Sequence, residues 1–338
     1  MLARGSISDS LAVATVVIEA WYRVDGEGGL VLDFDRAPSP SDPPSTSGHV
    51  LWNEVSVTVS GTVYGPKQAP NVTPVMLSVG RERRRLIVFG DRRWEKTLGG
   101  SLEPSDAAPF DSIPLSFERA FGGKYTEPPG PHPVSGLPHP GGEVFYSLNP
   151  DGRGFYKNAA SAEGSPLPNI ELPDELIKEW DQRPEPAGFS PCPTLMALRF
   201  PSEYLTRVLG LTPGRPPPDL TLDDMGPHAA RLSLRGLHYA PGKLIFSSVM
   251  TGTPVELTGA GRQKIQFNVV GPPVNVVTAS GDRSGSATGP PLRAELRSIH
   301  IDADGGHVLF VHGYSTSYHP DFAPEWLRVL PNSAPTEP

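Results

Sequence analysis

Between Gly90 and Pro191 this chain is so rich in proline and glycine that long regular elements have little room there. The 338 residues include 41 prolines and 36 glycines, and both residue types favour turns. Within this stretch, however, an apolar residue recurs every few positions beside an arginine, glutamate or asparagine. A solvated linker has little use for Trp, Phe and Leu, so the pattern predicts long, ordered loops.

Five short strings stand out in this region. These are 90–94 (GDRRW), 114–123 (PLSFERAFGG), 149–155 (NPDGRGF), 167–171 (LPNIE) and 186–191 (PAGFSP). Main-chain groups in a packed loop have no ladder partner, and each one left dry costs about 1–3 kcal/mol. Arginine brings five donors, while asparagine and glutamate bring acceptors.

We therefore expect a structural network of side chains that holds the loops in shape. Its expected members are Asp91, Arg92, Trp94, Glu118, Arg119, Asn149, Arg153, Asn169 and Glu171. The alternative is that the same carboxylates and arginines form a catalytic or ligand-binding cluster, because ion-pair networks and active sites look alike in sequence.

In this order, the five strings resemble the domain-of-unknown-function family twenty-one sixty-nine, which is linked to bacterial type VI secretion. Residues 55–66 (VSVTVSGTVYGP) also resemble the early strand and turn of that family. Past Pro191 the resemblance weakens. It implies a non-catalytic adaptor or chaperone that binds a toxin effector or its PAAR-tipped carrier and helps to load it onto the VgrG spike.

An adaptor of this kind would bind its partner through apolar and aromatic side chains in the loops and at sheet edges. The candidate partner-binding residues are Trp94, Phe110, Phe117, Phe121, Phe155 and Phe189. We expect most of them to lie in the core, because aromatic residues flanked by glycine more often lock loops than contact partners.

Composition is typical of a soluble globular protein, with 20% charged and 37% hydrophobic residues. The net charge of −8 argues against nucleic acid as a partner, and the one basic run, 81–85 (RERRR), is interpreted as a hairpin tip. The apolar run 11–18 is too short to span a bilayer. We expect a cytoplasmic protein without a cofactor, in which the single cysteine, Cys192, is a buried or idle thiol.

Strand signals dominate both ends of the chain. Residues 55–64 alternate valine with serine or threonine, the period of a half-buried strand, and hairpins are predicted for 12–34 and 75–89. Short strands follow from 230 to 314. The predicted fold is mainly β, with two β-sandwich-like lobes and an ordered loop region between them. The expected units are 8–100 with a mobile loop at 35–48, 101–220 with a short helix at 173–181, 221–325, and a tail at 326–338.

Three other chemistries were considered. Residues 307–315 (HVLFVHGYS) look like the strand before an oxyanion hole, but no G-x-S-x-G follows. His300, His307, His312 and His319 give no strong metal template, and cross-strand surface histidines are the simpler interpretation. Glu118 and Glu171 could serve a glycoside hydrolase. A carbohydrate-active hydrolase or carbohydrate-binding module is therefore the alternative function.

Overall fold

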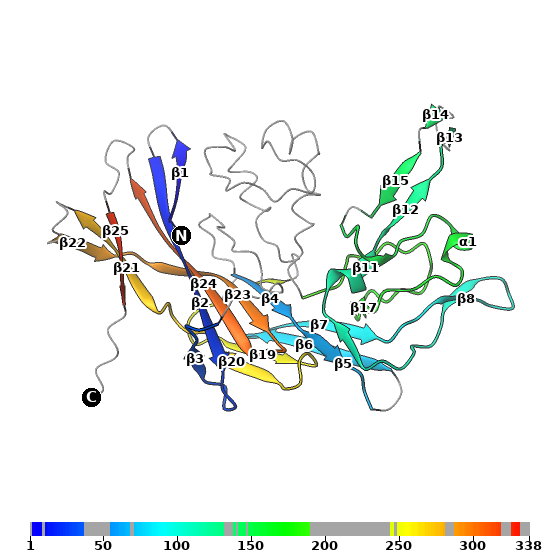
Figure 1. Cartoon of the computed structure of the whole chain (residues 1–338), viewed down its shortest axis with the longest axis horizontal. Helices are drawn as coiled ribbons and strands as arrows, with labels where there is room; N and C mark the ends of the chain where they lie inside the picture. The colour runs from blue at the N-terminus through cyan, green and yellow to red at the C-terminus, as the bar shows by residue number, and fades with distance from the viewer. Residues whose placement is uncertain are drawn as a thin grey trace.

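The computed structural model is mainly β, and two large sheets form its main body (Figure 1). It describes residues 2–8, 11–36, 55–67, 71–131, 138–139, 141–146, 148–189, 244–246, 249–280, 287–318 and 326–331. Within these ranges the helical elements are the 3-10 turn η1 (Phe117–Arg119) and α1 (Ala159–Ala162). In the same part of the chain, no helix has the length and apolar character that crossing a membrane requires.

The first sheet joins strands from the two ends of the chain in the order β1-β2-β24-β23-β4-β18, with β3 paired to β2. Its neighbours are antiparallel except for β23 and β4, which run parallel. The strands are β1 (Leu2–Ser8), β2 (Leu11–Val24), β3 (Leu30–Leu32), β4 (Val55–Ser60), β18 (Ile245–Phe246), β23 (Ala294–Asp302) and β24 (His307–Tyr318).

The second sheet has the order β17-β7-β6-β19-β20 and is antiparallel throughout. Its strands are β6 (Val72–Val79), β7 (Glu82–Phe89), β17 (Ile170–Glu171), β19 (Pro254–Thr258) and β20 (Ile265–Asn268). The β6–β7 hairpin turns at Gly80 and Arg81. The basic run is therefore no hairpin tip: only Arg81 lies in the turn, and the residues after it belong to β7.

The two expected lobes are not separate, because each large sheet contains strands from both ends of the chain. Strand β2 pairs with β24 from Ala12 opposite Tyr318 to Arg23 opposite His307, and β6 pairs with β19. Alternating apolar and polar residues reveal a strand but not its partner. Strands that pair across more than 170 residues therefore look the same in sequence as strands of two independent lobes.

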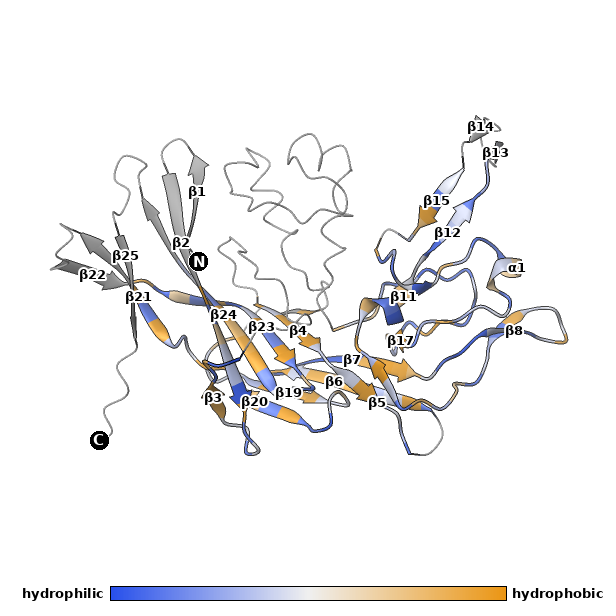
Figure 2. Cartoon of the chain, in the orientation of Figure 1, coloured by the Kyte–Doolittle hydropathy of each residue, from blue (hydrophilic) through white to orange (hydrophobic). Residues whose placement is uncertain are grey.

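One hydrophobic core is built from buried residues of both sheets, and strands of both sheets carry orange, hydrophobic segments in Figure 2. The inward positions alternate along each strand, as Val57 and Val59 do in β4, and both are fully buried. Phe267 of the second sheet meets Phe310 of the first edge-to-face at 5.9 Å. Burying each such side chain contributes about 1.5–3 kcal/mol, so this shared core holds the sheets together.

A smaller body contains most of the described residues between Trp94 and Trp180 and lies beside the sheets (Figure 1). This body has its own hydrophobic core, which consists of Trp94, Phe121, Ala162, Leu167 and Ile177. Short ladders connect its loops: β8 (Trp94–Lys96) with β9 (Leu102–Pro104), β11 (Phe121–Gly122) with β16 (Arg153–Gly154), β12 (Lys124–Glu127) with β15 (Gly142–Phe145), and β13 (Gly130–Pro131) with β14 (Pro138–His139).

Two further ladders lie elsewhere. Strand β5 (Thr62–Tyr64) pairs with β10 (Ser112–Pro114). A three-stranded sheet joins β21 (Val274–Ser280), β22 (Ala287–Pro291) and β25 (Trp326–Pro331). The expected continuous strand at 55–64 is thus broken at Gly61, where β4 ends and β5 begins. A side chain there would lie 2.7 Å from the Ala303 Cβ.

The helix expected at 173–181 does not form, and this segment is a series of turns. Side-chain acceptors bond its main chain instead of helical carbonyl groups. Glu171 Oε2 accepts from Ile177 N at 2.9 Å, and Gln182 Oε1 accepts from both Lys178 N and Glu179 N. The residues whose initial proline and apolar spacing predicted a helix therefore form a loop that is capped by side chains and buries Ile177. The expected mobile loop is described only up to residue 36, and its remainder lies outside the described residues.

Candidate functional site

Asn169 is the centre of a polar network that ties four of the five strings together. Its main chain donates to Arg119 O at 2.8 Å and accepts from Phe89 N at 2.7 Å. Its side-chain amide donates to Asp91 Oδ1 at 3.0 Å and to Phe89 O at 3.1 Å, and its amide oxygen faces Arg153 Nη1 at 3.2 Å. Arg119 Nη1 lies 3.4 Å from the same oxygen. Every hydrogen-bonding group of this fully buried asparagine is thus used.

A buried ion pair between Arg92 and Glu171 lies next to this centre, with side chains only 8% and 2% exposed. Arg92 Nη2 donates to Glu171 Oε1 and also to Pro168 O at 2.9 Å, and its guanidinium lies 3.8 Å from the centre of the Phe89 ring. Burial raises the pKa of the Glu171 carboxyl, and Arg92 opposes that rise. Because the carboxylate also accepts from the main chain of Ile177, the pair fixes the loop that follows β17.

Asn149 holds the third part of the network. Its side-chain nitrogen donates to Phe117 O at 2.7 Å and Phe121 O at 3.0 Å, and its main-chain oxygen accepts from Gly123 N at 2.8 Å. Gly122 has a φ of 152°, and a Cβ on it would lie 2.0 Å from Asn149 O. The paired glycines of the second string thus make room for the asparagine of the third.

Glu118 departs from the expected network. Its side chain is exposed, and only its main-chain oxygen takes part, accepting from Arg153 Nε at 3.2 Å. Glu118 lies on η1, whose single turn directs Phe117 inward and so directs the next side chain outward. Glu171 is buried, so the two carboxylates do not face one open cleft as a glycosidase pair would.

The aromatic candidates for partner binding lie mostly inside the protein. Trp94, Phe121 and Phe189 are each 2% exposed and Phe117 is 7% exposed, so a partner cannot reach them in this conformation. Phe110 and Phe155 are half-buried. These side chains pack the loops, as glycine-flanked aromatic residues usually do.

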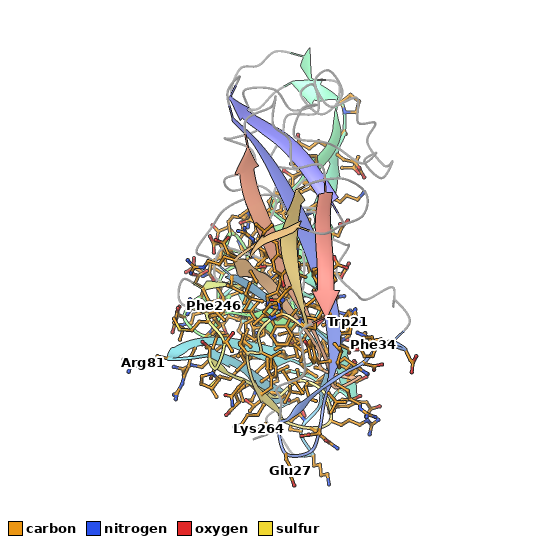
Figure 3. All side chains as sticks on the ribbon, turned by 90° about the vertical axis from the view of Figure 1, so that its left-hand side faces the viewer. Trp21, Glu27, Phe34, Arg81, Phe246 and Lys264 are labelled. Atoms are coloured by element: carbon orange, nitrogen blue, oxygen red, sulfur yellow. The ribbon has the colours of Figure 1, made fainter. Side chains whose placement is uncertain are left out.

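Exposed apolar side chains occur elsewhere. Among the described residues, the large ones are Val31, Phe34, Leu98, Phe145, Leu148 and Met250. Phe34 is 87% exposed, and Figure 3 shows it on the rim of the molecule, away from the core.

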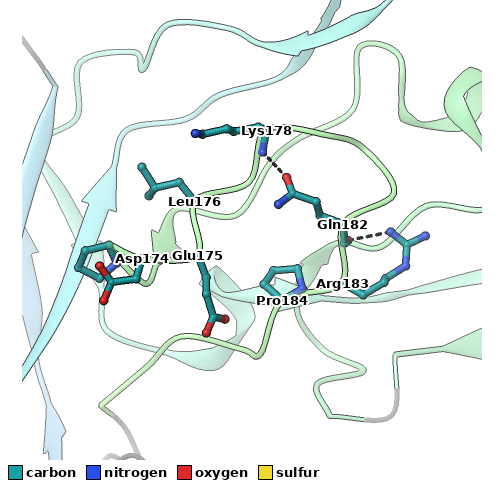
Figure 4. Close-up of a pocket in the computed structure, with 8 residues that line it drawn as sticks. Asp174, Glu175, Leu176, Lys178, Gln182, Arg183 and Pro184 are labelled. Atoms are coloured by element: carbon teal, nitrogen blue, oxygen red, sulfur yellow. Dashed lines mark hydrogen bonds between the residues drawn. The ribbon is translucent and has the colours of Figure 1, made fainter.

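Two adjoining hollows follow the capped loop at 173–184. One has a volume of about 520 Å³ and is lined by Pro173–Leu176, Lys178 and 182–184 (Figure 4). The other, of about 290 Å³, lies between the loop and strand β7 and is called the β7 groove below. It is lined by Arg83, Arg84, Arg85, Leu86, Leu172, Pro173, Asp174, Glu175, Glu185, Pro186, Ala187, Gly188, Phe189 and Leu244. Pro173, Asp174 and Glu175 line both hollows.

The described histidines do not gather around a metal position. His300 is buried and bonded to Thr58 Oγ1 at 2.9 Å and Ser60 Oγ at 3.0 Å, so it is not the surface histidine that the sequence suggested. His312 is buried opposite Leu296 on the neighbouring strand. Burial lowers the pKa of both imidazoles to about 4. His319 lies outside the described residues, and within them no three His, Cys, Asp or Glu side chains converge.

Sequence reasoning overlooked the tyrosines of the loop body and the arginines of β7. Tyr146 Oη donates to Pro184 O at 3.0 Å, and Tyr156 Oη donates to Pro166 O. Tyr156 directly follows the third string and Tyr146 lies three positions before it, a signal that could have placed them in the network. The arginines were dismissed because a charged run between two apolar runs usually marks a turn.

Comparison with known proteins places this chain in a family. The chain matches the family model described as "Uncharacterized protein conserved in bacteria (DUF2169)" over residues 37–312. No curated protein matches the chain, and no solved structure does. The match extends over most of the 338 residues and includes all five strings, so this chain belongs to the DUF2169 family.

Proposed function

We propose that this protein is a non-catalytic adaptor of type VI secretion. It binds a toxin effector or that effector's PAAR-tipped carrier in the cytoplasm and helps to load it onto the VgrG spike. The observation that carries the proposal is how the polar residues of the five strings are bonded. Their arginines and asparagines bond main-chain groups of the same loops, as Asn169, Asn149 and Arg92 do.

Groups that are bonded and buried in this way maintain the shape of the loops and lie out of reach of a substrate. Asn169 has all its hydrogen-bonding positions occupied, and the Arg92–Glu171 pair is almost fully buried. The residues of the five strings therefore support a frame. A frame of this kind supports an adaptor role, because it presents a fixed surface to a partner.

The surface of the protein offers the features that partner binding needs. Phe34 and Met250 are 87% and 67% exposed, and apolar side chains of this size attract apolar surface on another protein. The short ladders of the loop body and the outer strands of both sheets have edges, which are common docking places for extended segments. An adaptor needs such reversible contacts because it must later release its cargo.

Co-purification tests this proposal. The tagged protein is expressed with the toxin, PAAR protein and VgrG protein encoded beside it, and a toxin encoded elsewhere in the same genome is the matched control. We expect the neighbouring toxin or its PAAR carrier to co-purify in a stoichiometric complex and the control toxin to stay behind. Failure of the toxin, PAAR and VgrG proteins all to co-purify would refute the adaptor role.

A further inference from the structure

Strand β7 has one edge that, within the described part of the chain, is paired only near its C-terminal end. On one side it pairs with all of β6, from Val72 opposite Phe89 to Val79 opposite Glu82. On the other side β17 covers only its end, where Ile170 lies opposite Val88 and Glu171 opposite Ile87. Among the described residues, no strand pairs with residues 82–86 on this second side.

The hydrogen-bonding pattern shows which main-chain groups point out of this edge. In an antiparallel sheet, successive residues direct their N–H and C=O groups to opposite sides of the strand. Phe89 N donates to Asn169 O at 2.7 Å, so Phe89 faces β17. Every second residue before Phe89 faces the same side, so the main-chain groups of Arg85 and Arg83 also point to the side on which β17 lies. Strand β17 ends before it reaches them. The Arg83 carbonyl accepts from Arg84 Nη1 at 3.2 Å.

The covering strand stops for a chemical reason. After Glu171 opposite Ile87, the next residue that should bond to β7 is two positions on, opposite Arg85. That residue is Pro173, which has no N–H to donate. The chain leaves the sheet there and forms the capped loop, and the space that a longer β17 would have filled is the β7 groove.

The groove matches an extended peptide in its lining. Its floor is apolar and buried, with Leu86, Ala187, Phe189 and Leu244 each at most 3% exposed. Arg83 and Arg85 are exposed and share the outer face of the sheet with their cross-strand partners Ser78 and Met76. A strand added to this edge would alternate its side chains between the apolar floor and the arginines.

Charge decides which peptide fits best. Opposite charges directly across two strands stabilise the pairing, and like charges destabilise it. Acidic side chains are therefore favoured at every second position, opposite Arg85 and Arg83. Asp174, Glu175 and Glu185 also line the groove. The intervening side chains of the peptide would face the buried apolar floor and should therefore be apolar.

We propose that the open edge of β7 binds an extended segment of a partner protein by strand addition, with alternating acidic and apolar side chains. The inference deepens the proposed function by naming the surface and the chemistry of the bound segment, and it rests on that function for the identity of the partner. Main-chain bonds to Arg85 and Arg83 provide affinity, and the arginine side chains set the register.

Binding is measured first with a defined probe. A labelled ten-residue peptide of alternating valine and glutamate is titrated into the full-length protein and followed by fluorescence anisotropy, with a valine–lysine peptide as control. Hydrogen exchange is measured with and without the peptide. We expect binding of the acidic peptide alone, with new protection of the Arg85 and Arg83 amides. The Arg84 amide should not change, because it already faces β6.

Three variants complete the test. Arg85→Pro removes a donor that faces the groove and not one that β6 uses, so the hairpin should still fold. Arg83→Glu/Arg85→Glu reverses the charge and leaves the main chain intact. Arg81→Glu is the matched control, since Arg81 is exposed at the turn and does not line the groove (Figure 3). We expect the first two to weaken binding by about tenfold or more and the control by less than about twofold.

Several outcomes would overturn the inference: no binding of the acidic peptide, equal binding of the lysine peptide, unchanged affinity in the charge-reversed variant, or peptide protection away from β7. The same variants in the co-purification assay separate the two proposals. If wild-type protein captures the neighbouring toxin and the charge-reversed variant captures it equally, the groove is not its docking site and the adaptor role stands. If no partner is captured but the peptide binds β7 as described, the adaptor role fails and the groove stands.

Discussion

Replacing Arg92 with methionine should destabilise this protein more than any surface change. The substitution keeps an apolar chain over the Phe89 ring but leaves the Glu171 carboxylate, 2% exposed, without its cation. Removing one partner of a buried pair costs about 3–5 kcal/mol. A loss of this size is a large fraction of the total stability of a typical domain.

The assay is urea unfolding of wild type, Arg92→Met, Glu171→Gln and the double variant, with free energies from linear extrapolation. Arg93→Met is the matched control, because Arg93 is adjacent and exposed, and it should stay within about 0.5 kcal/mol of wild type. The double variant should recover part of the loss, because it no longer buries an unpaired charge.

The loss in Arg92→Met should also depend on pH. Burial raises the pKa of Glu171 above its ordinary value of 4.5, and without Arg92 that rise is larger. A carboxyl whose pKa is raised on folding costs nothing below its unfolded pKa and costs most above its folded pKa. The destabilisation should therefore shrink as the pH falls toward 4.5. A variant within about 1 kcal/mol of wild type at pH 8 would refute the buried-pair reasoning.

Three further predictions follow from the same contacts. The protein should lose stability as the pH falls from 6.5 to about 4, because burial keeps His300 and His312 neutral in the folded state while the unfolded chain binds protons. At about 1.4 kcal/mol per pH unit, this interval corresponds to roughly 3 kcal/mol for each histidine. Urea unfolding at a series of pH values measures this loss, and His300→Asn should make it smaller. Gly122→Ala should cost about 2 kcal/mol or more, because its Cβ would meet Asn149 O at 2.0 Å; a wild-type melting temperature would contradict this. Arg153→Ala should lower the free energy of unfolding in urea by only about 1 kcal/mol, since the Arg153 side chain is 28% exposed. A loss above about 3 kcal/mol would show that its hydrogen bond to Asn169 is shielded from water.

Local features of the fold were predictable from the sequence, and long-range ones were not. The alternation in residues 55–60 and 75–89 marks real strands, because an inward position is apolar whatever its partner is. Which strands pair depends on contacts such as β2 with β24, and their residues lie about 300 positions apart. No pattern within one strand carries that information.

The candidate site divides in the same way. The role of Asn169 and Arg92 was predictable, because a buried loop needs donors and acceptors and these residues supply them. The exposure of Glu118 was not, since it depends on one 3-10 turn. The capped loop at 173–184 was misread as a helix because Glu171 and Gln182 bond its main chain from outside the predicted segment. Such nonlocal caps leave no mark in helical periodicity.

Hydrogen exchange of wild-type protein tests the central claim most directly, namely that the proline- and glycine-rich middle is a frame bonded by its own side chains. The decisive amide is Ile177, which lies in no helix or strand and donates only to Glu171 Oε2 among the described residues. The account predicts that this amide exchanges as slowly as the amides of β7 that face β6 and is released in Glu171→Ala. Exchange of Ile177 at the rate of an open chain in wild-type protein would contradict the account.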